Sequence, residues 1–152
     1  MENLMPEIVM KPIGRVRNEV KERGREGWEE VASEIVIDES LTECLDGLEQ
    51  FSHIIIIYWM HRVAPSRQLV AKIHPRGRAD LPLVGLFSTR TPERPNPLGV
   101  TTAKLVGRNR NVLKVVGLDA LDGTPVIDIK PYMPGYDSPP DAKEADWVKK
   151  LR

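Results

Sequence analysis

The sequence predicts a mainly β protein, a single closed or nearly closed β-barrel with short helical segments. Its apolar residues fall into short runs of strand length, and turns rich in Gly and Pro separate these runs. The run from Ile54 to Met60 is apolar at both odd and even positions, which is typical of a strand covered on both faces. Closing the sheet into a barrel removes exposed edges and is the simplest arrangement for so many strands.

The individual elements follow from the same pattern of β-branched and aliphatic residues between turn residues. Strands are expected at Ile8–Arg17, Ser33–Ile37, Ser52–Val63, Leu69–Ile73, Leu83–Ser88, Gly99–Gly107, Val112–Leu118 and Val126–Ile129. A short helix is expected over Leu41–Gln50, and a tight turn at 109–111 joins its flanking strands into a hairpin. The residues after Pro140 form either a short terminal helix or a loose tail. We therefore expect one domain over residues 1–152, with its core at about 8–137.

Length and composition place the chain among folded proteins. Its 152 residues, 41% hydrophobic and 29% charged, suffice to bury a core without metals or disulfides. The longest apolar run is far shorter than the roughly 20 residues that cross a bilayer, and no secretion signal opens the chain, so we expect a cytoplasmic protein without a membrane partner. Cys44 is the single cysteine, which agrees with a reducing compartment and favours a core or surface residue over a catalytic thiol.

The formal net charge is zero, but the charges are unevenly distributed. Residues 19–49 hold eleven acidic and three basic residues, whereas residues 62–94 hold seven basic and two acidic ones. The seven are Arg62, Arg67, Lys72, Arg76, Arg78, Arg90 and Arg94. Such a basic segment can engage the phosphates of a polyanion, or it can be a solvated loop.

Common nucleotide and metal signatures are missing. The sequence has neither a G-x-G-x-x-G nor a G-x-x-x-x-G-K-[ST] motif, so any nucleotide is held in another way. His53 and His61 are separated by roughly 26 Å along one strand and cannot share an ion, and His74 could approach only one of them. We expect no metal site.

A proline-rich loop at residues 89–97, TRTPERPNP, is the first candidate for a site. Its prolines at 92, 95 and 97 restrict the backbone and predict that Thr91, Arg94 and Asn96 are held extended. Side chains on a stiff loop bind a ligand at a small ordering cost. Arg90 and Arg94 suit a phosphate or carboxylate, and Asn96 suits an amide or purine edge. The alternative is a stiff lead-in to the next strand, with the arginines merely exposed.

The second candidate is the stretch GLDALDGTPVIDIKPYMPGYD at residues 117–137. Asp128 and Lys130 lie on one face of a strand and form either a structural ion pair or part of a site. Asp119 could supply a base or accept a hydrogen bond from a ribose or an exocyclic amine. Asp122 is better explained as the cap of its own turn.

Both candidates belong to motifs that resemble one family. In order and spacing, FSHIIIIYWMHR, GLFSTRTPERPNPLGVTTAKL and LDALDGTPVIDIKPYMP are similar to the TsaA/TrmO-like family, and KPIGRVRN at residues 11–18 matches its usual opening. The resemblance runs from about Ile8 to Asp137. It implies a β-barrel methyltransferase that uses S-adenosylmethionine and acts on tRNA. Characterised members methylate N6 of threonylcarbamoyladenosine beside the anticodon, as homodimers with the methyl donor near the subunit interface.

The resemblance also implies which residues form the site. By position, the donor would be bound by His61, Arg62, Arg90, Leu118, Asp119, Ala120 and Leu121. The tRNA anticodon loop would be bound by Arg94, Asn96, Lys130 and Tyr132, with Arg76 and Arg78 on phosphates. For a catalytic carboxylate that accepts the N–H of the attacking amine, Asp128 is the first candidate and Asp119 the second. Arg94 could grip the carboxyl of the threonylcarbamoyl group.

Other functions stay open at this stage. Some bacterial members carry a further C-terminal domain thought to help hold tRNA, and this sequence stops at Arg152, which predicts weaker RNA affinity or a different target. A non-catalytic module of the same fold that binds S-adenosylmethionine or RNA is the main alternative. A hydrolase that uses the carboxylates is a further alternative, but no set of nucleophile, base and orienting residue supports it.

Overall fold

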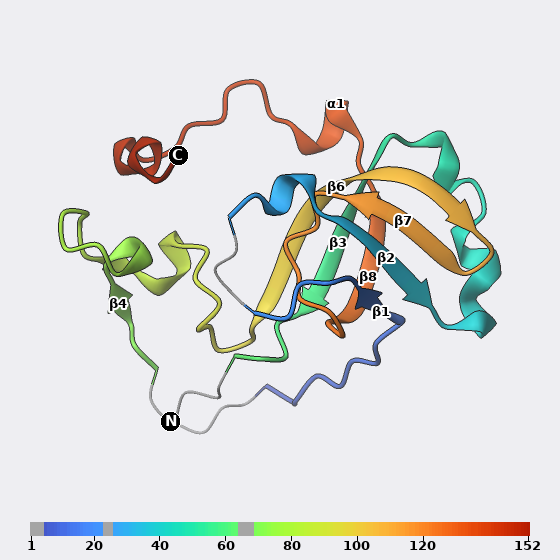
Figure 1. Cartoon of the computed structure of the whole chain (residues 1–152). Helices are drawn as coiled ribbons and strands as arrows, with labels where there is room; N and C mark the ends of the chain where they lie inside the picture. The colour runs from blue at the N-terminus through green and yellow to red at the C-terminus, as the bar shows by residue number, and fades with distance from the viewer. Residues whose placement is uncertain (1–4, 23–25, 64–68) are drawn as a thin grey trace.

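Six antiparallel strands close into a barrel in the computed structural model of the chain, which describes residues 5–22, 26–63 and 69–152 (Figure 1). In spatial order they are β1 (Gly14–Arg17), β2 (Ala32–Ile37), β7 (Val112–Val116), β6 (Leu98–Asn109), β3 (His53–Trp59) and β8 (Pro125–Pro131), which pairs back to β1. The helices of the described chain are short: η1 (Trp28–Glu30), η2 (Glu39–Leu45), η3 (Leu48–Gln50), η4 (Pro75–Gly77), η5 (Leu86–Ser88), α1 (Pro134–Asp137) and η6 (Asp146–Leu151). The predicted fold class is confirmed.

Strand β3 contributes the central residues of the apolar core inside the barrel. Ile54, Ile56 and Tyr58 point inward and are 0%, 0% and 5% exposed. The other five strands contribute Val16, Ile35, Ile37, Ala103, Leu113, Val115 and Val126 to the same core. On the outer face of β3, Ile55 and Ile57 are only half-buried. The second apolar face of this strand is therefore only partly covered within one chain.

The predicted hairpin joins β6 to β7. Asn109 pairs with Val112, which leaves Arg110 and Asn111 as a two-residue turn. Arg110 has a φ of 55°, the left-handed geometry that such a turn requires. The Asn111 side chain fixes the turn to β2 because its Nδ2 donates to the Ile37 carbonyl at 2.7 Å.

The helix expected over Leu41–Gln50 is wrong in type and extent. The segment instead forms η2 and η3, two 3₁₀ helices. Gly47 lies between them with a φ of 89°, a conformation that an α-helix cannot continue through.

The N-terminal strand is shorter than expected. Pairing starts at Gly14, where β1 meets both β2 and β8, and the expected residues from Ile8 onward are not part of it. Ile8 is 82% exposed, and Pro12 has no N–H to give to a ladder. The four-residue strand β1 nevertheless lies inside the sheet, between two neighbours.

Two expected strands lie outside the barrel. The segments expected at Leu69–Ile73 and Leu83–Ser88 form only β4 (Lys72–Ile73) and β5 (Val84–Gly85), which pair with each other. With η4, η5 and the C-terminal helix η6 they make up what we call the side lobe, residues 69–94 and 146–151 (Figure 1). Of the two alternatives for the tail, the terminal helix is confirmed.

Candidate functional site

Three segments that are distant in sequence meet at one end of the barrel. They are the residues after β1, the exit of β3 and the β7–β8 loop, residues 117–124. Backbone hydrogen bonds fasten the loop to the β1 side: Gly123 N donates to the Val16 carbonyl and Asp122 N to the Val20 carbonyl, each at 2.8 Å. Gly117 and Gly123 have φ values of 87° and 81°, so both bends of the loop need the freedom of glycine.

Asn18 organises this junction, and the sequence analysis did not single it out. Its Nδ2 donates to the Ala120 carbonyl at 2.9 Å and to Ser33 Oγ at 3.0 Å. Its backbone N–H donates to Asp122 Oδ1 at 3.0 Å. The Asp122 carboxylate therefore binds the segment after β1, where it also forms an ion pair with Lys21. The prediction that Asp122 caps its own turn is wrong.

Tyr58 supports the loop from inside the barrel. Its hydroxyl donates to the Asp119 carbonyl at 2.7 Å and lies 2.9 Å from Thr101 Oγ1. Because the phenol hydrogen goes to the carbonyl, Thr101 is the donor in the second bond. A Cβ at Gly99 would clash with the Tyr58 ring, so only glycine fits beside it.

The Tyr58 hydroxyl stays protonated at neutral pH. Its pKa is raised, mainly by burial and to a lesser extent by the charge of Asp119. The hydrogen bond with Thr101 and the charge of Arg90 act in the opposite direction and lower the pKa. The structure thus brings Arg90 and the 118–121 loop around the same hydroxyl. The sequence alone offered one signal for this role, a hydroxyl at an inward position of an apolar strand.

Asp119 has a perturbed carboxyl group. The residue as a whole is exposed, but partial desolvation of its carboxyl raises the pKa, and the like charge of Glu29 adds to the effect. A carboxyl of this kind holds a proton at higher pH than an ordinary aspartate and accepts one more readily.

His61 and Arg62 follow β3 and lie beside the same loop. His61 Nε2 is 3.9 Å from the position that a Cβ would occupy at Gly123. Desolvation, followed by the charge of Arg62, lowers the pKa of His61, which favours the neutral imidazole. Arg62 Nη1 donates to the Lys21 carbonyl at 3.0 Å, so its guanidinium helps to hold the segment after β1.

The proline-rich loop is stiff, but Arg94 is folded back onto it. Arg94 Nη1 donates to the Thr89 carbonyl at 2.8 Å and to the Thr91 carbonyl at 3.3 Å, and its guanidinium carbon is 5.7 Å from the centre of the Phe87 ring. Asn96 is exposed, and its carbonyl accepts from Leu98 N at 2.7 Å in a tight three-residue turn. The loop therefore presents Asn96 directly, whereas Arg94 also stabilises the loop itself.

The remaining predicted residues lie elsewhere. Asp128 Oδ2 and Lys130 Nζ form an ion pair at 2.9 Å on the outer wall of β8, with side chains 45% and 60% exposed. Tyr132 packs edge-on against His53 at a ring distance of 6.3 Å, near the start of β3. That end of the strand is roughly 20 Å from its exit, at about 3.3 Å per residue. Arg76 and Arg78 lie in the side lobe, and Arg67 lies outside the described residues.

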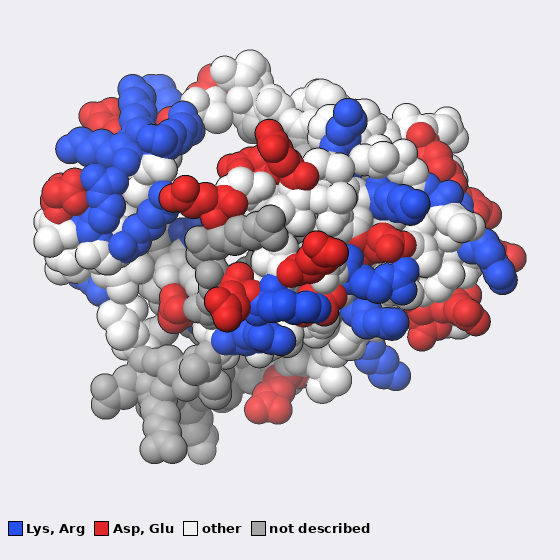
Figure 2. Space-filling model, viewed as in Figure 1, with Lys and Arg blue, Asp and Glu red and all other residues white. Residues whose placement is uncertain are grey.

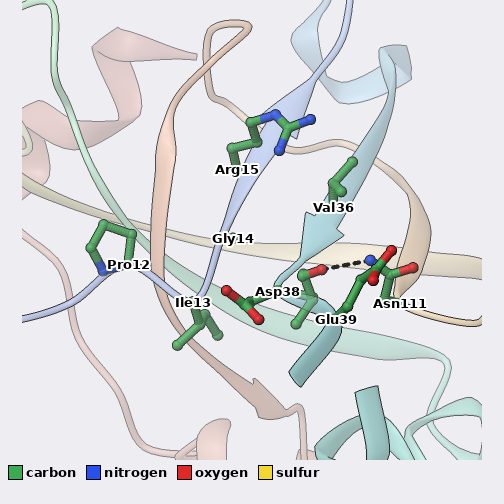
Figure 3. A pocket seen from close by; sticks show the side chains of 9 residues that line it. Pro12, Ile13, Gly14, Arg15, Val36, Asp38, Glu39 and Asn111 are labelled. Atoms are coloured by element: carbon green, nitrogen blue, oxygen red, sulfur yellow. Dashed lines mark hydrogen bonds between the residues drawn. The ribbon is translucent and has the colours of Figure 1, made fainter. Parts of the chain in front are cut away.

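Three further features concern cavities, metal ligands and membrane helices. A hollow of about 580 Å³ is lined by residues 12–15, 36–39 and 111, at the start of β1, and it contains none of the predicted site residues (Figure 3). Among the described residues, no three His, Cys, Asp or Glu side chains form a group that could hold a metal. No helix in the same part of the chain is long and apolar enough to span a membrane.

Comparison with known proteins identifies relatives along most of the chain. The tRNA-methyltransferase O N-terminal domain family matches residues 19–138. A probable S-adenosyl-L-methionine-binding protein of Methanothermobacter thermautotrophicus is 45% identical over 138 residues, which are 87% of this chain and 95% of that protein. An S-adenosyl-L-methionine-binding protein of Archaeoglobus fulgidus is 39% identical over 134 residues, or 86% and 93% of the two chains.

Two longer relatives carry more specific names. The mouse tRNA (adenine(37)-N6)-methyltransferase is 43% identical over 108 residues, which are 71% of this chain but 25% of the mouse protein. The crystal structure of TrmO from Pseudomonas aeruginosa superimposes with a TM-score of 0.73 at 29% identity, and covers 93% of this chain and 63% of that one. This chain thus spans less than two thirds of either longer protein.

Proposed function

Because the chain belongs to the tRNA-methyltransferase O family, we propose that it transfers a methyl group from S-adenosylmethionine to N6 of an adenosine in tRNA. The observation that carries the proposal is the junction at the β3 exit, where the Tyr58 hydroxyl donates to the carbonyl of Asp119 and the charge of Arg90 lowers the pKa of the same hydroxyl. Tyr58, Arg90 and Asp119 all lie within residues 19–138, the part of the chain that matches the family, which supports their assignment to one site.

The residues at this junction fit the chemistry of S-adenosylmethionine. Its carboxylate suits the guanidinium groups of Arg90 and Arg62, and its ammonium or ribose hydroxyls suit the carboxylate of Asp119. Backbone groups of residues 118–121, His61 and the half-buried side chain of Leu121 supply the remaining contacts. When bound, this cofactor supplies a methyl group on a sulfonium, which is a good leaving group.

The chain itself needs to align the reactants and exclude water rather than provide a strong base. The exocyclic amine of adenine is a poor nucleophile because its lone pair is delocalised into the ring. A carboxylate that accepts its N–H helps, and the proton leaves afterwards. The geometry favours Asp119 for this step, since it lies at the junction with a raised pKa, whereas Asp128 is paired with Lys130 on the outer wall.

The preferred adenosine is the threonylcarbamoyl form next to the anticodon. Its added carboxyl group offers a target for an arginine, and a base in an anticodon loop is already partly unstacked, which reduces the cost of presenting it to a pocket. Arg94 and Asn96 are the residues that would read this nucleotide. The hydrogen bonds of Arg94 within its loop leave from Nη1, so the rest of the guanidinium edge is the part that would meet the substrate.

A homodimer would complete the site. The half-buried outer face of β3 continues into Val100 of β6, which is 49% exposed, and a second copy would cover this apolar wall. Asp128 and Lys130 lie on the same wall, because Ile57 pairs with Asp128 and Ile55 with Lys130. In a dimer these two residues would therefore lie at the subunit interface.

The direct test is methyl transfer in vitro. The chain is incubated with S-adenosylmethionine labelled in the methyl group and with tRNA that carries or lacks the threonylcarbamoyl group. We expect label in N6 of the modified adenosine and less or none in the unmodified tRNA. Arg94→Ala should lower kcat/KM on modified tRNA by about tenfold to a hundredfold, the equivalent of a lost charge-assisted pair of about 1.5–3 kcal/mol. Equal losses on both tRNAs would show that Arg94 reads something else.

A donor-binding module without catalysis is the second candidate. The names of the two archaeal relatives support it, since they mention S-adenosylmethionine binding and no transfer. Calorimetric titration with S-adenosylmethionine separates the two functions. Binding without label in any tRNA favours the module, and absence of both binding and transfer overturns both candidates.

A further inference from the structure

The C-terminal helix η6 is docked on the side lobe by arginine side chains. Arg76 Nη1 donates to the Leu151 carbonyl at 3.0 Å, and Arg78 Nη1 donates to the Lys150 carbonyl at 2.8 Å. Trp147 and Leu151 are half-buried on this helix. The segments joined in this way are about 75 residues apart, so the contact is visible only in the folded chain.

Arg78 is fully engaged in this contact. Its Nε and Nη2 donate to the two carboxylate oxygens of Asp80 at 3.0 and 2.6 Å, while Nη1 holds the tail. The same pair lowers the pKa of Asp80 and compensates its charge. Arg78 is therefore a positioning residue, which leaves other cations of the lobe to meet a partner.

Lys149 and Lys150 are those cations. Both are exposed on η6, and neither forms a direct ion pair among the described residues, although the charge of Lys150 contributes to the lowered pKa of Asp80. Arg76 lies beside them, because its Nη1 donates to the Leu151 carbonyl at the end of the same helix, and Figure 2 shows Lys and Arg side chains gathered over this part of the molecule. We call Arg76, Lys149 and Lys150 the tail–lobe cluster.

The side lobe is connected to the segment of Arg90 through backbone hydrogen bonds. Thr89 N donates to the Leu86 carbonyl of η5 at 3.2 Å, and the next residue is Arg90, which lies near the Tyr58 hydroxyl. Leu86 N in turn donates to the Ala71 carbonyl beside β4 at 2.9 Å. The lobe that carries the cluster therefore leads directly into the chain segment that contains Arg90.

We propose that the tail–lobe cluster binds the phosphate backbone of the RNA substrate, with Lys149 and Lys150 of the C-terminal helix as its principal contacts. This inference rests on the proposed function for the identity of the polyanion. Lysine side chains on a short docked helix contact phosphates without reading bases, so the surface adds affinity and leaves nucleotide choice to the proline-rich loop.

The test compares tRNA binding by the whole chain and by a Lys149→Gln/Lys150→Gln double variant over a range of salt concentrations. If the variant no longer neutralises one or two phosphates, its Kd should rise about five- to twenty-five-fold at 0.1 M salt, and the slope of log K against log salt should fall by about 0.7 for each of those phosphates. The matched control is Lys11→Gln/Lys114→Gln, two exposed lysines before β1 and on β7. The control should change neither quantity appreciably.

A third variant separates phosphate binding from helix docking. Arg78→Gln should weaken tRNA binding and also speed amide exchange in residues 146–151, whereas the lysine variant should leave that exchange unchanged. If the double lysine variant binds tRNA like its control while the wild type methylates tRNA, the cluster proposal is overturned and the proposed function stands. If the wild type binds tRNA through these lysines but transfers no methyl group, the cluster proposal stands and the proposed function is overturned. The same variants are tested for binding to vesicles that contain phosphatidylserine. If the double lysine variant loses vesicle binding that the wild type shows, but binds tRNA normally, the cluster belongs to a membrane surface and the proposal is overturned.

Discussion

The barrel and the side lobe are stabilised by different interactions. The barrel has a continuous ladder of strand pairs around a core with residues such as Ile35, Ile54 and Leu113 at 0% exposure. The lobe has two strands of two residues each, a few buried side chains such as Leu81 and Leu86, and arginine side chains bound to backbone carbonyls. Little buried apolar surface and many exposed polar contacts characterise regions that open locally at low free energy.

This difference assigns separate tasks to the two regions. The barrel holds Tyr58 and the 117–124 loop in fixed positions, as alignment of a methyl group requires. Under the proposed function, the lobe would present its exposed cations, such as Lys149 and Lys150, to the RNA. Four measurements on substituted chains test this division between the two regions.

Core truncation should affect the two regions to different extents. Ile56→Ala removes an inward side chain at the centre of β3 and should lower the free energy of unfolding by about 2–5 kcal/mol, because it leaves a cavity. Leu81→Ala should instead speed amide exchange within residues 69–94 and leave the barrel strands protected. Chemical denaturation and amide exchange measure the two effects, and equal loss of protection in both regions would show that they unfold as one unit.

Arg90 lies where the two regions meet, and its loss should affect the cofactor. Arg90→Ala should weaken S-adenosylmethionine binding about tenfold to a hundredfold, the equivalent of about 1.5–3 kcal/mol for a charge-assisted pair. Calorimetric titration gives the affinity, and chelator in the buffer should not change it. An unchanged Kd would remove Arg90 from the binding site, whereas loss of binding in chelator would indicate a metal.

Removal of the Tyr58 hydroxyl, which lies inside the barrel, should have a smaller effect on stability and on methyl transfer. Tyr58→Phe removes the donor to the Asp119 carbonyl and leaves Thr101 without its acceptor, at a cost of about 1 kcal/mol in stability. Its effect on transfer should exceed the effect of Thr101→Val, which keeps the bond to the loop. Thermal unfolding and steady-state kinetics of the two variants provide the comparison, and identical kinetics would mean that the hydroxyl does not position the loop.

Asp119 should make the smallest contribution, a dependence of folding stability on pH. Its folded pKa is raised, so the folded state binds the proton more tightly and stability falls as pH rises from the ordinary aspartate value of 3.8 through the folded pKa. Because the residue is exposed, solvent screening keeps this change small. Asp119→Asn should remove that part of the pH dependence of unfolding and also the acid limb of the transfer rate. A transfer profile with an unchanged acid limb would point to Asp128, and Asp128→Asn is the matched comparison.

The candidate site could be predicted from the sequence only in part. The motifs around Arg90 and Asp119 stood out because polar residues cluster beside prolines and glycines, and the structure brings both motifs to the Tyr58 hydroxyl. Asn18 and Tyr58 were missed as site residues, since their partners lie about 60 to 100 positions away and the one local signal, the hydroxyl of Tyr58 in an apolar strand, does not identify a partner. Two predicted residues lie away from the junction: Asp128 is on the outer wall of the barrel, and Tyr132 is at the far end of β3.

The barrel itself was predictable from the sequence, because apolar runs of strand length alternate with turn residues, and the run in β3 is apolar at both odd and even positions, as in a strand inside a closed sheet. The hairpin at Arg110 was predictable for a similarly local reason, the conformational preference of its turn. The side lobe was not: the segments around β4 and β5 leave the barrel, and the C-terminal helix docks on them through Arg76 and Arg78. Guanidinium groups can bind any carbonyl within reach, so no pattern in the sequence specifies this docking, and it depends on the path of the chain around the completed barrel.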